Sequence, residues 1–291
     1  MDLHQALADF QAKIPLEGIV QEICTRNPQF TPEEVRQKLN TYVQEMPIAL
    51  RLVQPFLQPD QRILEVGAGL CLFSFFLKQQ GYAIWALEPD LGGFGFFSDL
   101  RAALLKRYAA LNLPLIPKPA EAVHPAAEGQ FDLIFSLNVL EHIPRYREAL
   151  CQLADVLTPR GLMVHSCPNY RIPYEPHFQI PVLKAWPKLS ERLFSKRIAA
   201  RRALWESLNF ISAGDLQRVA RECHLQLKFQ PSPLTQVFQR LQEDPVFAER
   251  HGRGWVRLTK ALQATGLLFL LQRIPPTWST PMTWVLRREM K

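Results

Sequence analysis

Short apolar runs alternate with amphipathic segments between residues 61 and 167 of this 291-residue chain. The apolar runs have the length of buried strands, and the segments with apolar residues at helical spacing predict helices. The alternation of the two predicts an α/β fold with a parallel sheet and helices on both faces. Strands are predicted at Arg62–Val66, Tyr82–Leu87, Leu113–Pro117, Phe131–Leu137 and Gly161–Cys167, and helices at Leu70–Gln80, Ser98–Leu111 and Tyr146–Leu157.

Two prolines weaken the third of these strands. Pro114 and Pro117 cannot donate hydrogen bonds to a neighbouring strand, so this segment is expected at an edge of the sheet. In a doubly wound sheet that begins in the middle, the third strand is the edge strand. The prolines therefore agree with that topology.

The flanking regions have a different pattern. Residues 1–58 are predicted to be helical, with one helix that begins after Thr31 as a capping box with Glu34 and ends near Met46, before Pro47. The alternation stops after Pro168. We therefore divide the chain into helices at 1–58, a core at 59–170, and a region at 171–291 that completes the sheet. Further elements are predicted at Ile48–Leu57, Ser212–His224, Leu225–Phe229, 233–273 and Pro281–Arg287.

The composition is that of an ordinary globular protein, with 47% hydrophobic and 21% charged residues. Five scattered cysteines without a CxxC pair predict neither a zinc site nor a disulfide framework, and a cytoplasmic location is the default. No secretory signal pattern precedes the first helix, and the apolar run at 266–271 is too short to span a bilayer.

The positive charge is concentrated in one part of the chain. The net charge is +7, and residues 184–260 contain 15 Lys or Arg against 7 Asp or Glu. Such a segment suits nucleic acid, anionic lipid or an acidic substrate, and it also describes a solvated helical face.

The turn after the first strand carries the most specific chemistry. Gly67 and Gly69 fit the start of a dinucleotide fingerprint, but Leu72 replaces its third glycine. Glu65, just before the turn, would repel a diphosphate and suits a cofactor with a cationic group. Glu88, at the end of the second strand, is placed to accept hydrogen bonds from ribose hydroxyls.

Four segments resemble the motifs of class I S-adenosylmethionine-dependent methyltransferases, of the group related to ubiquinone-biosynthesis enzymes. They are ILEVGAGLCLFS from Ile63, WALEPD from Trp85, FDLIFSLNVLEHI from Phe131 and LADVLTPRGLMVHSCPN from Leu153. The resemblance implies a Rossmann-like sheet of seven strands, mostly parallel with the last strand antiparallel, N-terminal helices, and a helical insertion after strand 5. It also implies S-adenosylmethionine as cofactor.

The resemblance implies a role for each matching residue. The glycine turn would approach the methionine and ribose parts of the cofactor, Glu65 its amino group, and Glu88 its ribose. Residues 120 and 121 would lie near the adenine, and the end of the fourth strand would pass beside the cofactor. The implied cofactor-binding set is Glu65, Gly67, Ala68, Gly69, Glu88, Pro89, Ala120, Glu121, Leu137 and Asn138.

Candidate catalytic residues follow the fourth and fifth strands, where acceptors bind in such sheets. His142 is a candidate base, and it also suits a helix start. Tyr170, Tyr174 and His177 lie in a proline-rich loop that suits either catalysis or structure. No metal is expected, because a set of Glu175, His177 and His165 depends on a loop of unknown shape.

We expect an enzyme that methylates a small molecule, with the methylated atom unresolved. A lipid- or quinone-like acceptor at a membrane is an alternative, with peripheral contact through 180–203 or 262–274. Signatures of RNA-binding modules are absent, which argues against a nucleic acid partner. Two further alternatives are an NAD-dependent oxidoreductase and a methyltransferase fold that binds or assembles without catalysis.

Overall fold

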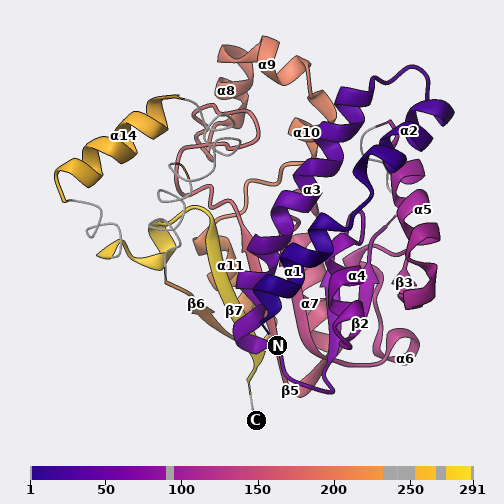
Figure 1. The fold of residues 1–291 in the computed structure, drawn as a ribbon. Coiled ribbons are helices and arrows are strands. Elements are labelled where there is room, and N and C mark those ends of the chain that lie inside the picture. The colour runs from indigo at the N-terminus through magenta and orange to yellow at the C-terminus, as the bar shows by residue number, and fades with distance from the viewer. Residues whose placement is uncertain (1, 90–94, 232–240, 242–252, 267–272, 290–291) are drawn as a thin grey trace. The chain divides into compact units, whose positions relative to one another are not determined.

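The protein has a single mixed sheet, as the sequence predicts. A computed structural model describes residues 2–89, 95–231, 241, 253–266 and 273–289 (Figure 1). Seven strands form the sheet in the order β3-β2-β1-β4-β5-β7-β6, and β7 runs antiparallel to β6. The predicted fold class, a Rossmann-like sheet with one antiparallel strand, is therefore confirmed.

The contacts divide the chain into two compact units. The first comprises Met1–Leu137 with Gln152–Val164, and the second comprises Asn138–Cys151 with His165–Lys291. The predicted boundaries at 58 and 170 stay predictions. Elements of the first unit are α1 (Leu3–Ala12), α2 (Leu16–Arg26), α3 (Pro32–Val53), η1 (Gln54–Phe56), β1 (Arg62–Val66), α4 (Leu72–Gln79), β2 (Ala83–Leu87), α5 (Phe97–Arg107), η2 (Ala109–Leu111), β3 (Leu115–Ile116), η3 (Ala120–Ala122), α6 (Pro125–Glu128) and β4 (Phe131–Leu137).

Parallel pairing in the first unit aligns the strand ends that carry the candidate site. Arg62 pairs with Ala83 and Val66 with Leu87, so β1 and β2 end together. Strand β3 has only two residues between Pro114 and Pro117, and it occupies one edge of the sheet. The prediction of a weak edge strand is confirmed, and its cause is the missing proline N–H groups.

Helix α3 is longer than predicted. It begins with the expected capping box of Thr31 and Glu34, but it continues through Pro47 to Val53. A proline leaves the carbonyl four residues earlier without its helical donor. In this fold the side-chain amide of Gln11 on α1 donates to that carbonyl, Val43 O, over 2.6 Å. A tertiary contact therefore replaces the lost hydrogen bond, which sequence periodicity does not reveal.

We expect Gln11→Ala to lower the free energy of unfolding by about 1–2 kcal/mol, because it leaves a partly buried carbonyl without its donor. Chemical denaturation with urea measures the change. Gln5→Ala on the same helix is the matched control, because the Gln5 side-chain amide donates to the exposed carboxylate of Asp9. In a Pro47→Ala variant, residue 47 regains a backbone N–H that can donate to the same carbonyl. Gln11→Ala should then lower the free energy of unfolding by a smaller amount. An unchanged cost there would contradict this explanation.

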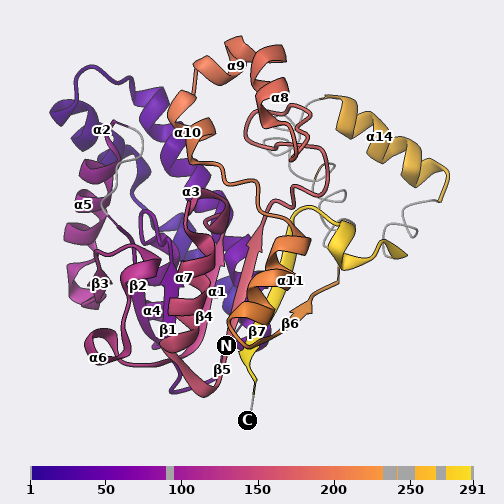
Figure 2. The ribbon, with the colours of Figure 1, turned by 180° about the vertical axis from the view of Figure 1, so that it is seen from behind.

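The second unit contains the region after strand β5. Helix α11 packs on β6 within this unit (Figure 2), and Ser212 caps α11 together with Asp215. Helix α7 and β5 each have residues in both units. The elements are η4 (Leu140–His142), α7 (Tyr146–Asp155), β5 (Leu157–Cys167), α8 (Pro187–Leu193), α9 (Ser195–Ala199), α10 (Arg202–Ser207), α11 (Ala213–Glu222), β6 (Leu225–Phe229), α14 (Arg253–Ala264), η6 (Pro276–Trp278) and β7 (Met282–Arg288).

The predicted helical stretch 233–273 lies largely outside the described residues, and so does much of 262–274. Among the helices that the structure describes, none has the length and apolarity needed to cross a membrane.

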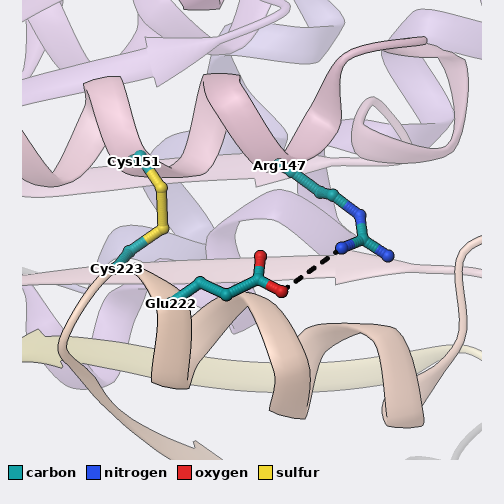
Figure 3. The surroundings of a disulfide bond; sticks show 4 residues. All are labelled: Arg147, Cys151, Glu222 and Cys223. Atoms are coloured by element: carbon teal, nitrogen blue, oxygen red, sulfur yellow. Dashed lines mark hydrogen bonds and ion pairs between the residues drawn. A yellow bond between two sulfur atoms is a disulfide. The ribbon is translucent and has the colours of Figure 1, made fainter.

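One pair of cysteines forms a disulfide, which corrects the expectation of none. Cys151 on α7 is bonded to Cys223 at the end of α11, across 72 positions of sequence (Figure 3). Arg147 and Glu222 form an ion pair of 3.5 Å beside it. The spacing of the cysteines along the sequence does not predict this disulfide, because it is the fold that brings two distant cysteines to a Cα–Cα distance of 5.4 Å.

Candidate functional site

The turn between β1 and α4 has the backbone geometry that its glycines allow. Gly67 and Gly69 have φ angles of 68° and 54°, in the left-handed region that favours glycine. The N–H groups of Gly67 and Ala68 both donate to Leu87 O at the end of β2, over 2.8 and 3.2 Å. The turn is therefore fixed to the neighbouring strand end.

Glu88 lies directly against this turn. Its Oε2 accepts a hydrogen bond of 2.7 Å from Gly69 N–H. The guanidinium of Arg101 on α5 lies 3.9 Å from Oε1, and both side chains are largely buried. A carboxylate held beside a glycine turn is suited to accept ribose hydroxyls, which fits the predicted role.

Tyr42 covers the same turn from α3. A Cβ on Gly69 would lie only 2.7 Å from the Tyr42 ring, so no side chain fits there. Burial, with smaller contributions from Glu45 and Glu88, raises the pKa of Tyr42 above its usual range. The sequence did not single out Tyr42 or Arg101, because an aromatic residue and a cation within helices belong to no recognisable sequence motif.

Glu65 is buried within β1, where its carboxylate accepts a very short hydrogen bond from the Ser74 hydroxyl. Burial raises the pKa of Glu65 to about 8, although the Ser74 hydrogen bond opposes the shift. A cation bound nearby would favour the ionised form. This environment fits the predicted role of Glu65 toward a cationic amino group.

The remaining predicted cofactor residues lie at strand ends or in adjoining turns. Pro89 follows β2, and Leu137 is the last residue of β4. Ala120 is buried and begins the 3-10 turn η3 that contains Glu121. Asn138 has a φ of 54° and donates its N–H to Ser166 O over 2.9 Å. Their contacts with a cofactor stay predictions.

A second group of candidates converges on Glu175 in the second unit. Its side chain is fully buried, and Oε1 lies 2.6 Å from His177 Nδ1 and 3.1 Å from the Tyr170 hydroxyl, which donates to it. Oε2 accepts a 2.6 Å hydrogen bond from Phe178 N–H. Burial would raise the pKa of Glu175, but the hydrogen bonds from His177 and Phe178 outweigh it and lower the pKa below its usual value.

His142 lies against His177, with the ring centroids 5.2 Å apart. Its Nδ1 is 2.9 Å from the Ser207 hydroxyl, which itself donates to Leu204 O. Ser207 therefore accepts from Nδ1–H, and the His142 Nε2 carries a lone pair. Burial lowers the pKa of His142 to about 4, and nearby His177 adds to the shift.

The two candidate tyrosines have different surroundings. Tyr170 is 2% exposed and belongs to an apolar cluster with Phe178, Trp205 and other residues, while its hydroxyl donates to Glu175. Burial and the Glu175 carboxylate raise the Tyr170 pKa well above its usual range, and its catalytic role stays a prediction. Tyr174 is half-buried in the same loop, with its hydroxyl inside.

One group of metal-ligating atoms is found in the described part of the chain. Ligand atoms of Glu141, His142 and His177 all lie within 4.8 Å of one another. Ligands of a bound divalent ion are usually about 3–3.5 Å apart, so these side chains would have to close around one. His165 does not join them, because it is fully buried against Trp284 on β7. The sequence suggested His165 and His177 as members of one metal site, but in the structure the His165 side chain packs against Trp284 instead.

Comparison with known proteins defines the class. The order of the sheet, the glycine turn after β1 and the acid after β2 agree with the fold and site that the sequence resemblance implied. A family model described as a methyltransferase domain matches residues 33–227. The chain therefore belongs to the methyltransferase-domain family, and S-adenosylmethionine is its cofactor.

Two relatives and one solved structure illustrate the range of similar proteins. An uncharacterized protein of Mycobacterium tuberculosis strain H37Rv is 35% identical over 222 residues, or 74% of each chain. The mitochondrial ubiquinone biosynthesis O-methyltransferase of Schizosaccharomyces pombe is 26% identical over 111 residues, covering 36% of this chain and 37% of its own. The CcbJ methyltransferase of Streptomyces caelestis has a TM-score of 0.49 at 14% identity, covering 84% of this chain and 90% of its own.

Proposed function

We propose that this methyltransferase acts on a small molecule through a hydroxyl group, with His177 as the general base. The observation that supports this most directly is the Glu175–His177 pair, with its 2.6 Å hydrogen bond. An ionised carboxylate on Nδ1 fixes the tautomer of the imidazole and leaves the Nε2 lone pair for a proton. This pairing is the arrangement used to orient histidine bases in other enzymes.

When bound, the cofactor supplies an electrophilic methyl group. The chain must hold the acceptor in line and remove a proton where the acceptor carries one. A hydroxyl oxygen needs such a base more than a neutral amine does, which supports a hydroxyl acceptor. His142 follows the end of β4 by five residues, and acceptors in such sheets bind beyond the strand ends.

The printed names of two relatives support the same acceptor chemistry. The proteins of Schizosaccharomyces pombe and of a Caulobacter strain are both named ubiquinone biosynthesis O-methyltransferases. Each aligns with little more than a third of this chain. The similarity supports a hydroxyl oxygen as the methylated atom. Screening of candidate compounds identifies the particular acceptor.

We expect Glu175→Gln to lower kcat by about 10- to 100-fold on any hydroxylated acceptor that the enzyme accepts. The acid limb of the pH–rate profile should move to lower pH, because the carboxylate no longer stabilises the imidazolium. His142 should not titrate until the pH falls to about 4, so it contributes no second limb near neutrality. Formation of S-adenosylhomocysteine with a panel of phenols, catechols and hydroxy acids measures these effects.

His4→Gln is the matched control, because His4 is exposed on α1. Binding of S-adenosylhomocysteine should be the same in the parent protein and in Glu175→Gln. If EDTA abolishes turnover and a divalent cation restores it, Glu141, His142 and His177 form a metal centre and the base assignment is wrong. Cofactor binding without turnover of any acceptor would favour the non-catalytic alternative.

A further inference from the structure

Helix α8 presents an apolar stripe to solvent. Trp186, Leu189 and Leu193 are spaced by three and four residues, so they lie on one face of the helix. They are 66%, 47% and 68% exposed, and Leu183 just before the helix is 45% exposed. Among the described residues these are four of the six large apolar side chains that are exposed. Such clustering marks an interaction surface.

Unpaired cations flank this stripe. Lys188, Arg192 and Lys196 are exposed, and none of them forms an ion pair with another described residue. Neighbouring cations are engaged, since Lys184 pairs with Asp215 and Arg202 pairs with Glu191 and Glu206. The free cations on α8 and α9 are therefore available to an external anion.

A hollow of about 760 Å³ lies beside two of these cations, Lys188 and Arg192. Its lining includes Lys188, Arg192 and Arg202 against the single carboxylate of Glu191. Helices α8 and α9, salmon in Figure 2, contact each other, and the buried Ile198 of α9 is part of the lining of the hollow. A positively charged hollow beside exposed leucines is suited to a phosphate group that is attached to an apolar chain.

We propose that α8 and α9 bind the protein to an anionic phospholipid surface, with Trp186, Leu189 and Leu193 inserted and Lys188, Arg192 and Lys196 on the headgroups. A nucleic acid would satisfy the cations but would leave the exposed leucines in water, because it offers stacking and charge rather than aliphatic surface. The proposal goes beyond methyl transfer and does not depend on the identity of the acceptor.

Flotation of the full chain with vesicles tests the proposal. Vesicles of phosphatidylcholine with about 30 mol% phosphatidylserine should retain the protein at low salt, and pure phosphatidylcholine should retain far less. The variant Lys188→Gln, Arg192→Gln, Lys196→Gln should bind the anionic vesicles roughly 10- to 100-fold more weakly. The variant Trp186→Ala, Leu189→Ala, Leu193→Ala should lose vesicle binding.

Leu258→Ala and Trp278→Ala are the matched controls, because both side chains are exposed but lie on other elements. Unchanged S-adenosylhomocysteine binding confirms that each variant is folded. The charge variant alters only exposed side chains, so it remains informative if the apolar variant does not fold. Equal binding to neutral and anionic vesicles, or no vesicle binding, would overturn the proposal. Retention on poly(U) without retention on vesicles would assign the surface to nucleic acid instead.

Discussion

Replacing Glu88 by alanine is expected to weaken S-adenosylhomocysteine binding by about 100-fold or more. Two hydrogen bonds from ribose hydroxyls to a carboxylate contribute roughly 3 kcal/mol together, which corresponds to a factor of more than 100 in Kd. The substitution also removes the acceptor of Gly69 N–H, which now bonds to Oε2 over 2.7 Å. Isothermal titration calorimetry gives the Kd directly.

Glu88→Gln refines the expectation. The amide keeps the shape and one acceptor oxygen but loses the negative charge, so its Kd should fall between those of the parent protein and Glu88→Ala. Glu33→Ala is the control, because this carboxylate is exposed on α3 and pairs with Arg36 on the same helix. If Glu88→Ala binds as tightly as the parent protein, the ribose assignment is wrong and the glycine turn has another occupant.

Loss of the Cys151–Cys223 disulfide is expected to cost about 3 kcal/mol of stability. The bond closes a loop across 72 positions, for which the chain-entropy relation gives about 4.4 kcal/mol, and disulfides typically contribute about 2–4 kcal/mol. For a chain of 291 residues the melting temperature should fall by about 5 °C. Differential scanning calorimetry of Cys151→Ser with Cys223→Ser measures the shift.

Reduction supplies an independent test of the same bond. Dithiothreitol should lower the melting temperature of the parent protein by a similar amount, and it should not change that of the double serine variant. Cys24→Ser is the control, because Cys24 is a free and half-buried thiol. If dithiothreitol and the double substitution both leave the melting temperature unchanged, the disulfide does not stabilise the fold.

The sequence itself determined the sheet and the turn. Local physics sets both, since the apolar runs have strand length, prolines 114 and 117 exclude a central strand, and Gly67 and Gly69 adopt the positive φ that other residues avoid. The acids Glu65 and Glu88 could be located for the same reason, because Glu65 lies within the strand before the turn and Glu88 directly follows the next strand. These few residues argued against a diphosphate cofactor, and the resemblance of four segments to methyltransferase motifs implied the cofactor class.

Only the tertiary structure decided which side chains meet. Gln11 reaches Val43 across two helices and lets α3 pass Pro47, and Tyr42 covers Gly69 from a helix outside every motif. Glu175 joins Tyr170 and His177, while His142 comes to the same place from 35 positions earlier in the chain. Cys151 and Cys223 pair across an even longer stretch. Periodicity and spacing describe residues that are close together along the chain, whereas these contacts arise from packing between segments that are distant in sequence.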